Sequence, residues 1–71
     1  MKAKKILRKI DKYRKKYILI DFVTLEDDYY CRVWDVRGPD GQTKNTDNYK
    51  TAKDTLLAAF TVADKMIKEV D

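Results

Sequence analysis

The sequence predicts an α+β domain in which a basic helix, a three-stranded antiparallel sheet and a long helix follow one another. Residues 51–70 carry apolar side chains at the i, i+3, i+4, i+7 spacing of an amphipathic helix. Residues 17–37 hold two β-branched and aromatic runs separated by a polar turn. Residues 1–16 are strongly basic around a narrow apolar stripe. Seventy-one residues make a single domain, 1–71, with residues 1–16 as a basic amphipathic helical arm.

The first predicted element is a helix over residues 3–16. A helix this short is marginal in water, so its apolar stripe must dock on the body of the domain, on a partner or on a membrane surface. The stripe consists of Ala3, Ile6, Leu7, Ile10 and Tyr13, with Tyr17 one step further.

Two strands are predicted next, over residues 17–25 and 29–37. If Glu26 and Asp27 are the loop residues, Asp21 faces Arg32 across the ladder, where opposite charges are favourable. The same register pairs Phe22 with Cys31, Ile20 with Val33, and Leu19 with Trp34. Asp35 fits the apolar face poorly, so we expect it near the end of the sheet.

A turn is predicted at residues 38–41, where Pro presets φ and Gly permits a left-handed conformation. Polar residues 42–50 then form a third, edge strand. Thr51 is expected to cap the final helix, with Asp54 three residues on as in a capping box. Four residues of that helix are expected to pack against Ile18, Ile20, Phe22 and Val33 of the sheet: Leu56, Phe60, Ala63 and Ile67.

The opposite sheet face is too apolar for ordinary surface. It would be covered by the N-terminal helix, by a second copy of the chain, or by a ligand such as nucleic acid. The residues that this register places on it are Tyr17, Leu19, Asp21, Val23, Tyr30, Arg32, Trp34 and Val36.

The composition argues against several kinds of site. A single cysteine, Cys31, and no histidine leave no usual zinc site and no Ser-His or Cys-His nucleophile pair. We therefore expect no enzyme, no metal and no cofactor. One cysteine suits a reducing compartment, and no apolar run approaches a membrane span, so we expect a cytoplasmic protein.

Charge is divided unevenly along the chain. Residues 1–16 carry nine Lys/Arg and one Asp, whereas residues 17–71 carry seven basic and eleven acidic residues. A basic segment on a mildly acidic body indicates an anionic partner such as nucleic acid or a membrane surface; a solvated or internally packed face is the alternative. Lys5, Arg8 and Lys12 are the candidate phosphate contacts on this segment.

The run from Asp28 to Lys44 and then from Tyr49 to Asp54 resembles the arm-type, AP2-like DNA-binding domain of phage tyrosine recombinases. In that family an aromatic and basic strand, an Asp/Gly turn, a third strand and a Thr-capped helix present a sheet face to the major groove. The resemblance implies DNA contacts on or beside that face from Arg32, Trp34, Arg37, Lys44 and Lys50. The order of elements is also similar to the double-stranded-RNA-binding domain, whose second helix opens with a motif like Lys50–Lys53.

Two functions are predicted on these grounds. The first is a small nucleic-acid-binding accessory protein, encoded by a phage or mobile element, that uses the basic helix and the aromatic, basic sheet face. The alternative is a non-enzymatic protein-binding module, a homodimer or an inhibitor of a host protein, that uses the Tyr/Trp sheet face.

Overall fold

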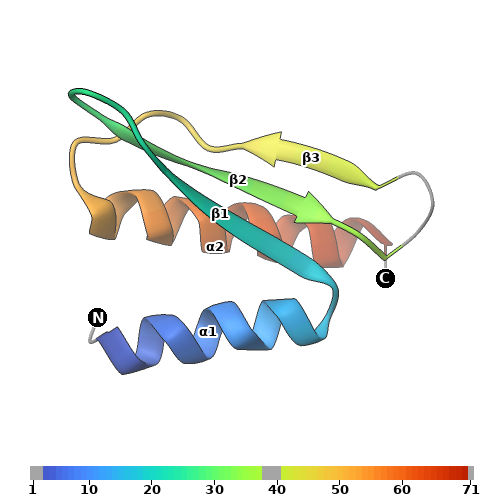
Figure 1. Ribbon diagram of the computed structural model, residues 1–71. Coiled ribbons are helices and arrows are strands. Elements are labelled where there is room, and N and C mark those ends of the chain that lie inside the picture. The colour runs from blue at the N-terminus through green and yellow to red at the C-terminus, as the bar shows by residue number, and fades with distance from the viewer. Residues whose placement is uncertain (1–2, 38–40, 71) are drawn as a thin grey trace.

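The computed structural model describes residues 3–37 and 41–70 and has the predicted order of elements (Figure 1). The helices are α1 (Ala3–Lys15) and α2 (Ala52–Val70); the strands are β1 (Ile18–Thr24), β2 (Tyr29–Asp35) and β3 (Gln42–Asn45). The strands form one antiparallel sheet in the order β1-β2-β3. Gly38, Pro39 and Asp40 of the predicted turn lie outside the described residues.

The predicted register of the first hairpin is confirmed. Phe22 pairs with Cys31, Ile20 with Val33, Leu19 with Trp34, and Asp21 with Arg32. The Leu25 N–H donates to the Asp28 carbonyl at 2.9 Å, which leaves Glu26 and Asp27 as the loop. A slip of one residue would move every side chain to the other face, so this loop determines which residues are buried.

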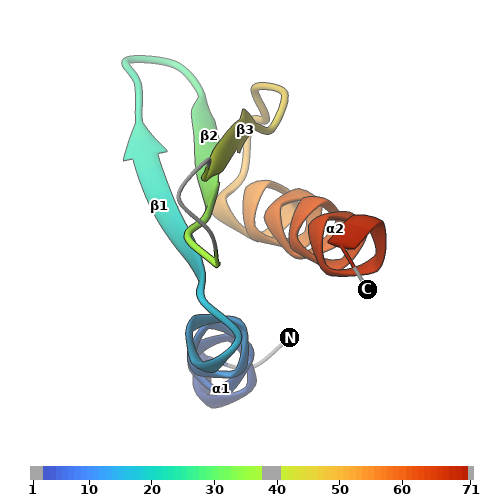
Figure 2. The same cartoon turned by 90° about the vertical axis from the view of Figure 1, so that its right-hand side faces the viewer.

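Helix α2 packs against one face of the sheet, and α1 lies beside α2 below the start of β1 (Figure 2). The buried apolar residues come from α1, the sheet and α2: Tyr13, Ile18, Cys31, Val33, Ala59, Phe60, Ala63 and Met66. Ile6, Ile10, Ile20, Leu56 and Ile67 pack partly buried around them. The body of the domain is thus the surface on which the apolar stripe of α1 docks. Leu7 was predicted to belong to that stripe, but it is 62% exposed.

Phe22 is less buried than predicted. It lies on the helix side of the sheet, yet it is 40% exposed. The cause is that β1 diverges from α1 toward the hairpin, so α1 does not reach this end of the strand (Figure 1). Its ring contacts Tyr29 instead, with 5.4 Å between ring centroids.

Asp35 lies at the end of β2, as expected, and its charge is satisfied there. Arg37 donates to it from Nε at 3.0 Å and from Nη2 at 2.8 Å. The same Nη2 donates to the Met66 carbonyl at 2.7 Å. These hydrogen bonds from Arg37 hold the pKa of the Asp35 carboxyl below its usual range. The pair therefore joins the end of β2 to the last turns of α2.

The third strand is shorter than the predicted 42–50. Regular pairing stops at Asn45, and the next bridge joins Tyr29 to Tyr49. Between these pairs, residues 46–48 oppose only residues 30–31, so the strand carries one extra residue, as in a β-bulge. Thr46 fills the break, because its Oγ1 accepts the Cys31 N–H at 2.9 Å.

The predicted cap of α2 is confirmed. Thr51 precedes the helix, and its Oγ1 accepts the Asp54 N–H at 3.2 Å. The buried Thr55 hydroxyl donates to the Thr51 carbonyl at 2.7 Å, so a polar group of the core is also satisfied.

Tyr17 makes the sharp connection between α1 and β1. Its φ is 64°, in the left-handed region that glycine usually occupies after a helix. The Tyr17 N–H donates to the Arg14 carbonyl, and the Val36 N–H donates to the Tyr17 carbonyl. This reversal ends α1 and folds it back beneath the sheet.

Candidate nucleic-acid interface

Most basic residues of α1 are exposed, because the apolar residues of the helix pack on the core. Ile6 and Ile10 pack on the core and Tyr13 is buried within it. The remaining positions of the described helix carry seven Lys/Arg and one Asp. Docking of the stripe therefore holds the predicted contacts Lys5, Arg8 and Lys12 on a fixed surface.

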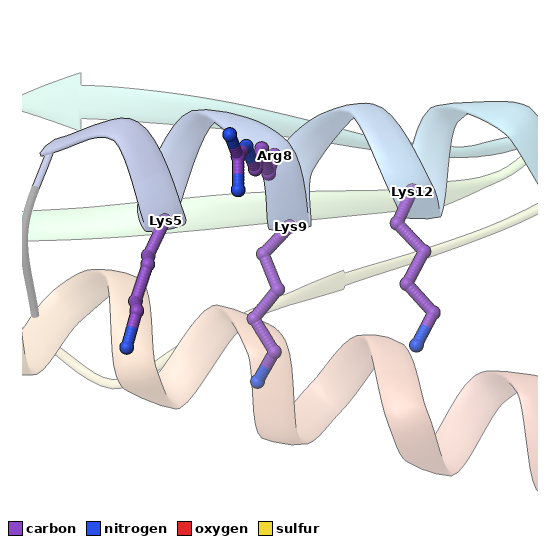
Figure 3. Close-up of a pocket in the computed structure, with 4 residues that line it drawn as sticks. All are labelled: Lys5, Arg8, Lys9 and Lys12. Carbon is purple, nitrogen blue, oxygen red and sulfur yellow. The ribbon is translucent and has the colours of Figure 1, made fainter.

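These three residues and Lys9 line one shallow hollow of about 320 Å³. Figure 3 shows Lys5, Lys9 and Lys12 extending from α1 toward α2, while Arg8 projects outward from the helix. The Lys9 ammonium lies 5.0 Å from the centre of the Phe60 ring, which is a cation–π contact. We call Lys5, Arg8, Lys9 and Lys12 the α1 cationic cluster. Lys9 was not among the predicted contacts, although its i+4 spacing from Lys5 indicated the shared surface.

Two carboxylates, one on α1 and one on α2, are engaged with residues outside the cluster. Asp11 lies 3.8 Å from Arg14 in an exposed pair, and Asp64 of α2 accepts a hydrogen bond from the Tyr13 hydroxyl at 2.7 Å. Between residues that the structure describes, Lys5, Arg8 and Lys12 form no ion pair. The cluster thus presents uncompensated positive charge to solvent.

Tyr13 anchors this surface to the rest of the protein. Its ring stacks on Phe60 with 5.7 Å between centroids, and its hydroxyl binds Asp64. Burial, together with the bond to Asp64, raises the pKa of the Tyr13 phenol. The helical spacing predicted Tyr13 as part of the apolar stripe. It did not predict the hydrogen bond to Asp64, which lies 51 residues further along the chain.

Arg32 and Trp34 lie together on the uncovered face of the sheet. The Arg32 guanidinium carbon is 5.9 Å from the centre of the Trp34 ring. Asp21 is the cross-strand neighbour of Arg32, so this face carries one charge of each sign at its centre. The indole Nε1 of Trp34 is covered and has no hydrogen-bond partner in the part of the chain that the structure describes.

The other predicted contacts do not join that face. The resemblance implied that Arg37 lies on or beside the open face, but Arg37 binds Asp35 and the Met66 carbonyl on the helix side. Lys44 pairs with Val33, whose side chain is buried under α2, so Lys44 also belongs to the helix side. Lys50 forms an ion pair with Asp28 before α2 begins. The eight predicted residues therefore lie on several surfaces: Lys5, Arg8 and Lys12 are together on α1, and only Arg32 and Trp34 share the open sheet face.

The described residues contain no group of three or more His, Cys, Asp or Glu that could hold a metal ion. Burial, with a smaller contribution from Asp21, raises the pKa of the Cys31 thiol to about 11, so it is protonated at neutral pH. Within residues 3–37 and 41–70, neither helix has the length and apolar character needed to cross a membrane.

Comparison with known proteins gives no match: no family model, no curated protein and no solved structure is significantly similar to this chain.

Proposed function

We propose that the protein binds nucleic acid through the α1 cationic cluster, chiefly by contacts to backbone phosphates. The observation that carries this proposal is the docking of α1, which leaves four cations on one surface that form no ion pair with any described carboxylate. Lysine and arginine are the residues that most often contact phosphate oxygens, and such contacts position a protein without reading sequence.

The dimensions of α1 suit several phosphate contacts. Its 13 residues extend about 20 Å, and Lys5 and Lys12 are separated by about 10 Å along the axis. A duplex carries one charge per about 1.7 Å of its axis, so a helix of this length passes several phosphates. Because lysine is a flexible point charge, the expected binding is strong at low salt and weakly selective.

The sheet face is a poorer surface for a polyanion. Asp21 lies directly opposite Arg32, and the two formal charges cancel. Stacking on Trp34 requires a base to approach beside that carboxylate. The proposal therefore assigns phosphate binding to α1 rather than to the face suggested by the family resemblance.

The test is to remove equal charge from the two helices. The variant K5Q/R8Q/K12Q lacks three cations of α1, and the matched control K53Q/K65Q/K68Q lacks three exposed cations of α2. Binding to short duplexes of two unrelated sequences is followed by fluorescence anisotropy between about 50 and 200 mM salt.

The α1 variant should bind both duplexes more weakly by the same factor. Its plot of log Kd against log salt should flatten by up to about 2.7, because each lost phosphate contact changes the slope by about 0.9. The α2 variant should keep the steeper slope. Equal losses in both variants would show that net charge alone, and not α1, governs binding.

A further inference from the structure

The face of the sheet opposite the helices lies open across all three strands (Figure 2). At the end of this face away from the hairpin, Leu19 is 40% exposed and Val36 is 43% exposed. Trp34 beside them, and Val23 and Tyr30 toward the hairpin, are partly exposed. An apolar sheet face of this kind is normally packed against another layer.

The side chains on this face alternate in size between the strands. In each cross-strand pair the residue from β1 is the shorter and the residue from β2 is the longer. The three pairs are Leu19–Trp34, Asp21–Arg32 and Val23–Tyr30. The face therefore has a row of short side chains along β1, the low row, beside a row of long side chains along β2, the high row.

Among the residues that the structure describes, the two charged side chains on this face form no ion pair. Asp21 and Arg32 are cross-strand neighbours, yet they form no ion pair, and Arg32 lies over Trp34. Asp21 and Arg32 can therefore each pair with an opposite charge on another molecule without breaking an ion pair within their own chain.

We propose that this face is the interface of a two-fold symmetric dimer, in which two copies of the chain pack sheet against sheet. A two-fold axis parallel to the strands and midway between β1 and β2 places β1 of one copy over β2 of the other. The high row of each copy then lies over the low row of its partner, and the Asp21 of each copy meets the Arg32 of the other. Shape and charge are thus both self-complementary, as an isologous interface requires. The result is a sandwich with sheets about 10 Å apart and the helices outside.

Pairing through the edge of β1 is a poorer arrangement. Asp21 is the central residue of Ile18–Thr24, so a symmetric antiparallel pair of β1 strands would place the two copies of Asp21 side by side. A charged residue in this position is a common means by which edge strands avoid one another.

Wild-type protein gives the first test. Its mass, measured by sedimentation over a concentration series without nucleic acid, should rise from that of a monomer to twice that value. Trp34 is the only tryptophan of the chain, so its quenching by acrylamide should fall over the same concentrations. A monomer at every concentration would overturn the proposal, as would a dimer whose Trp34 is quenched as readily as in the monomer.

Charge reversal gives the second test. D21R and R32D should each raise the dimer Kd by at least about tenfold, because symmetry makes each like-charge contact occur twice. The matched control D47R changes an exposed carboxylate outside this face and should leave Kd unchanged.

Mixing the two single variants separates the interface from effects inside one chain. The D21R chain carries two cations on the face and the R32D chain carries two carboxylates, so an equimolar mixture should form a heterodimer. The two like charges within each variant chain repel one another equally before and after mixing. Recovery of dimerisation on mixing therefore reports contacts between chains and not a change in the folding of the monomer. Single variants that dimerise as the wild type does, or folded variants that stay monomeric when mixed, would refute the interface.

Discussion

Tyr13→Phe removes the hydroxyl group that ties α1 to α2. The lost bond is a 2.7 Å contact to a carboxylate oxygen of Asp64. A hydrogen bond to a charged group contributes about 1.5–3 kcal/mol, and the lower end applies because Asp64 is exposed and its freed oxygen regains water. For a domain of this size, each kcal/mol lowers Tm by roughly 4–8 °C. We expect Tyr13→Phe to lower Tm by about 6–12 °C.

Tyr17→Phe is the matched control, because Tyr17 is 64% exposed and its side chain makes no described hydrogen bond. Thermal denaturation followed by circular dichroism gives the Tm of both variants, and urea denaturation gives their free energies of unfolding. A double-mutant cycle with Asp64→Asn should give a coupling energy of about 1 kcal/mol. Equal stabilities for Tyr13→Phe and Tyr17→Phe would refute the role of the Tyr13 hydroxyl.

The same bond predicts a loss of stability in alkali. The pKa of Tyr13 is raised in the folded state above its usual value of about 10, so the native state retains a proton that the unfolded state loses. Its contribution is therefore complete below pH 10 and declines as the pH rises above that value. Tyr13→Phe should flatten this alkaline limb of the stability curve. An unchanged limb would show that the phenol titrates normally.

Three further changes test the fold. Phe60→Ala should cost about 3–5 kcal/mol, since it empties a buried site, and an unchanged urea midpoint would show that this face of α2 is not the core. Thr51→Ala should cost about 1 kcal/mol through loss of the cap, whereas Thr51→Ser should be nearly neutral in the same assay; equal losses would exclude the hydroxyl as the cap. Because Arg37 lowers the pKa of Asp35 in the folded state, their bond contributes above pH 4 and is lost as the pH falls through the folded pKa. Asp35→Asn should thus be less stable than wild type at neutral pH but equal to it in strong acid, and a difference that persists in acid would assign the effect to packing.

Short sequence patterns predicted most of the fold, because strand register and helix ends depend on neighbouring residues. The acid–base pair Asp21–Arg32 selected the hairpin register, and Thr51 marked the start of α2. The extra residue after Asn45 was not predictable, because it depends on the Thr46 side chain reaching the backbone of β2. The apolar stripe of α1 predicted that the helix docks on something, but it did not identify the docking surface, which depends on the folded arrangement of β1 and α2.

The candidate site was predicted less well, for a related reason. Lys5, Arg8 and Lys12 share a surface because helical spacing brings them together. Arg37 looked equivalent to Arg32 in sequence, yet it follows the strand and turns to the helix side to neutralise Asp35. The side of the sheet on which a charged residue at a strand end lies depends on the groups that it binds. When such a group is distant in sequence, as the Met66 carbonyl is from Arg37, the local sequence does not reveal it.

The salt dependence of wild-type binding to duplex nucleic acid tests the central claim most directly. The claim is that α1 presents uncompensated cations to a polyanion. Anisotropy titrations should show binding at low salt that weakens linearly in log Kd against log salt, with a slope matching about three or four phosphate contacts. Absence of any binding to duplex DNA, single-stranded DNA or RNA at low salt would contradict it.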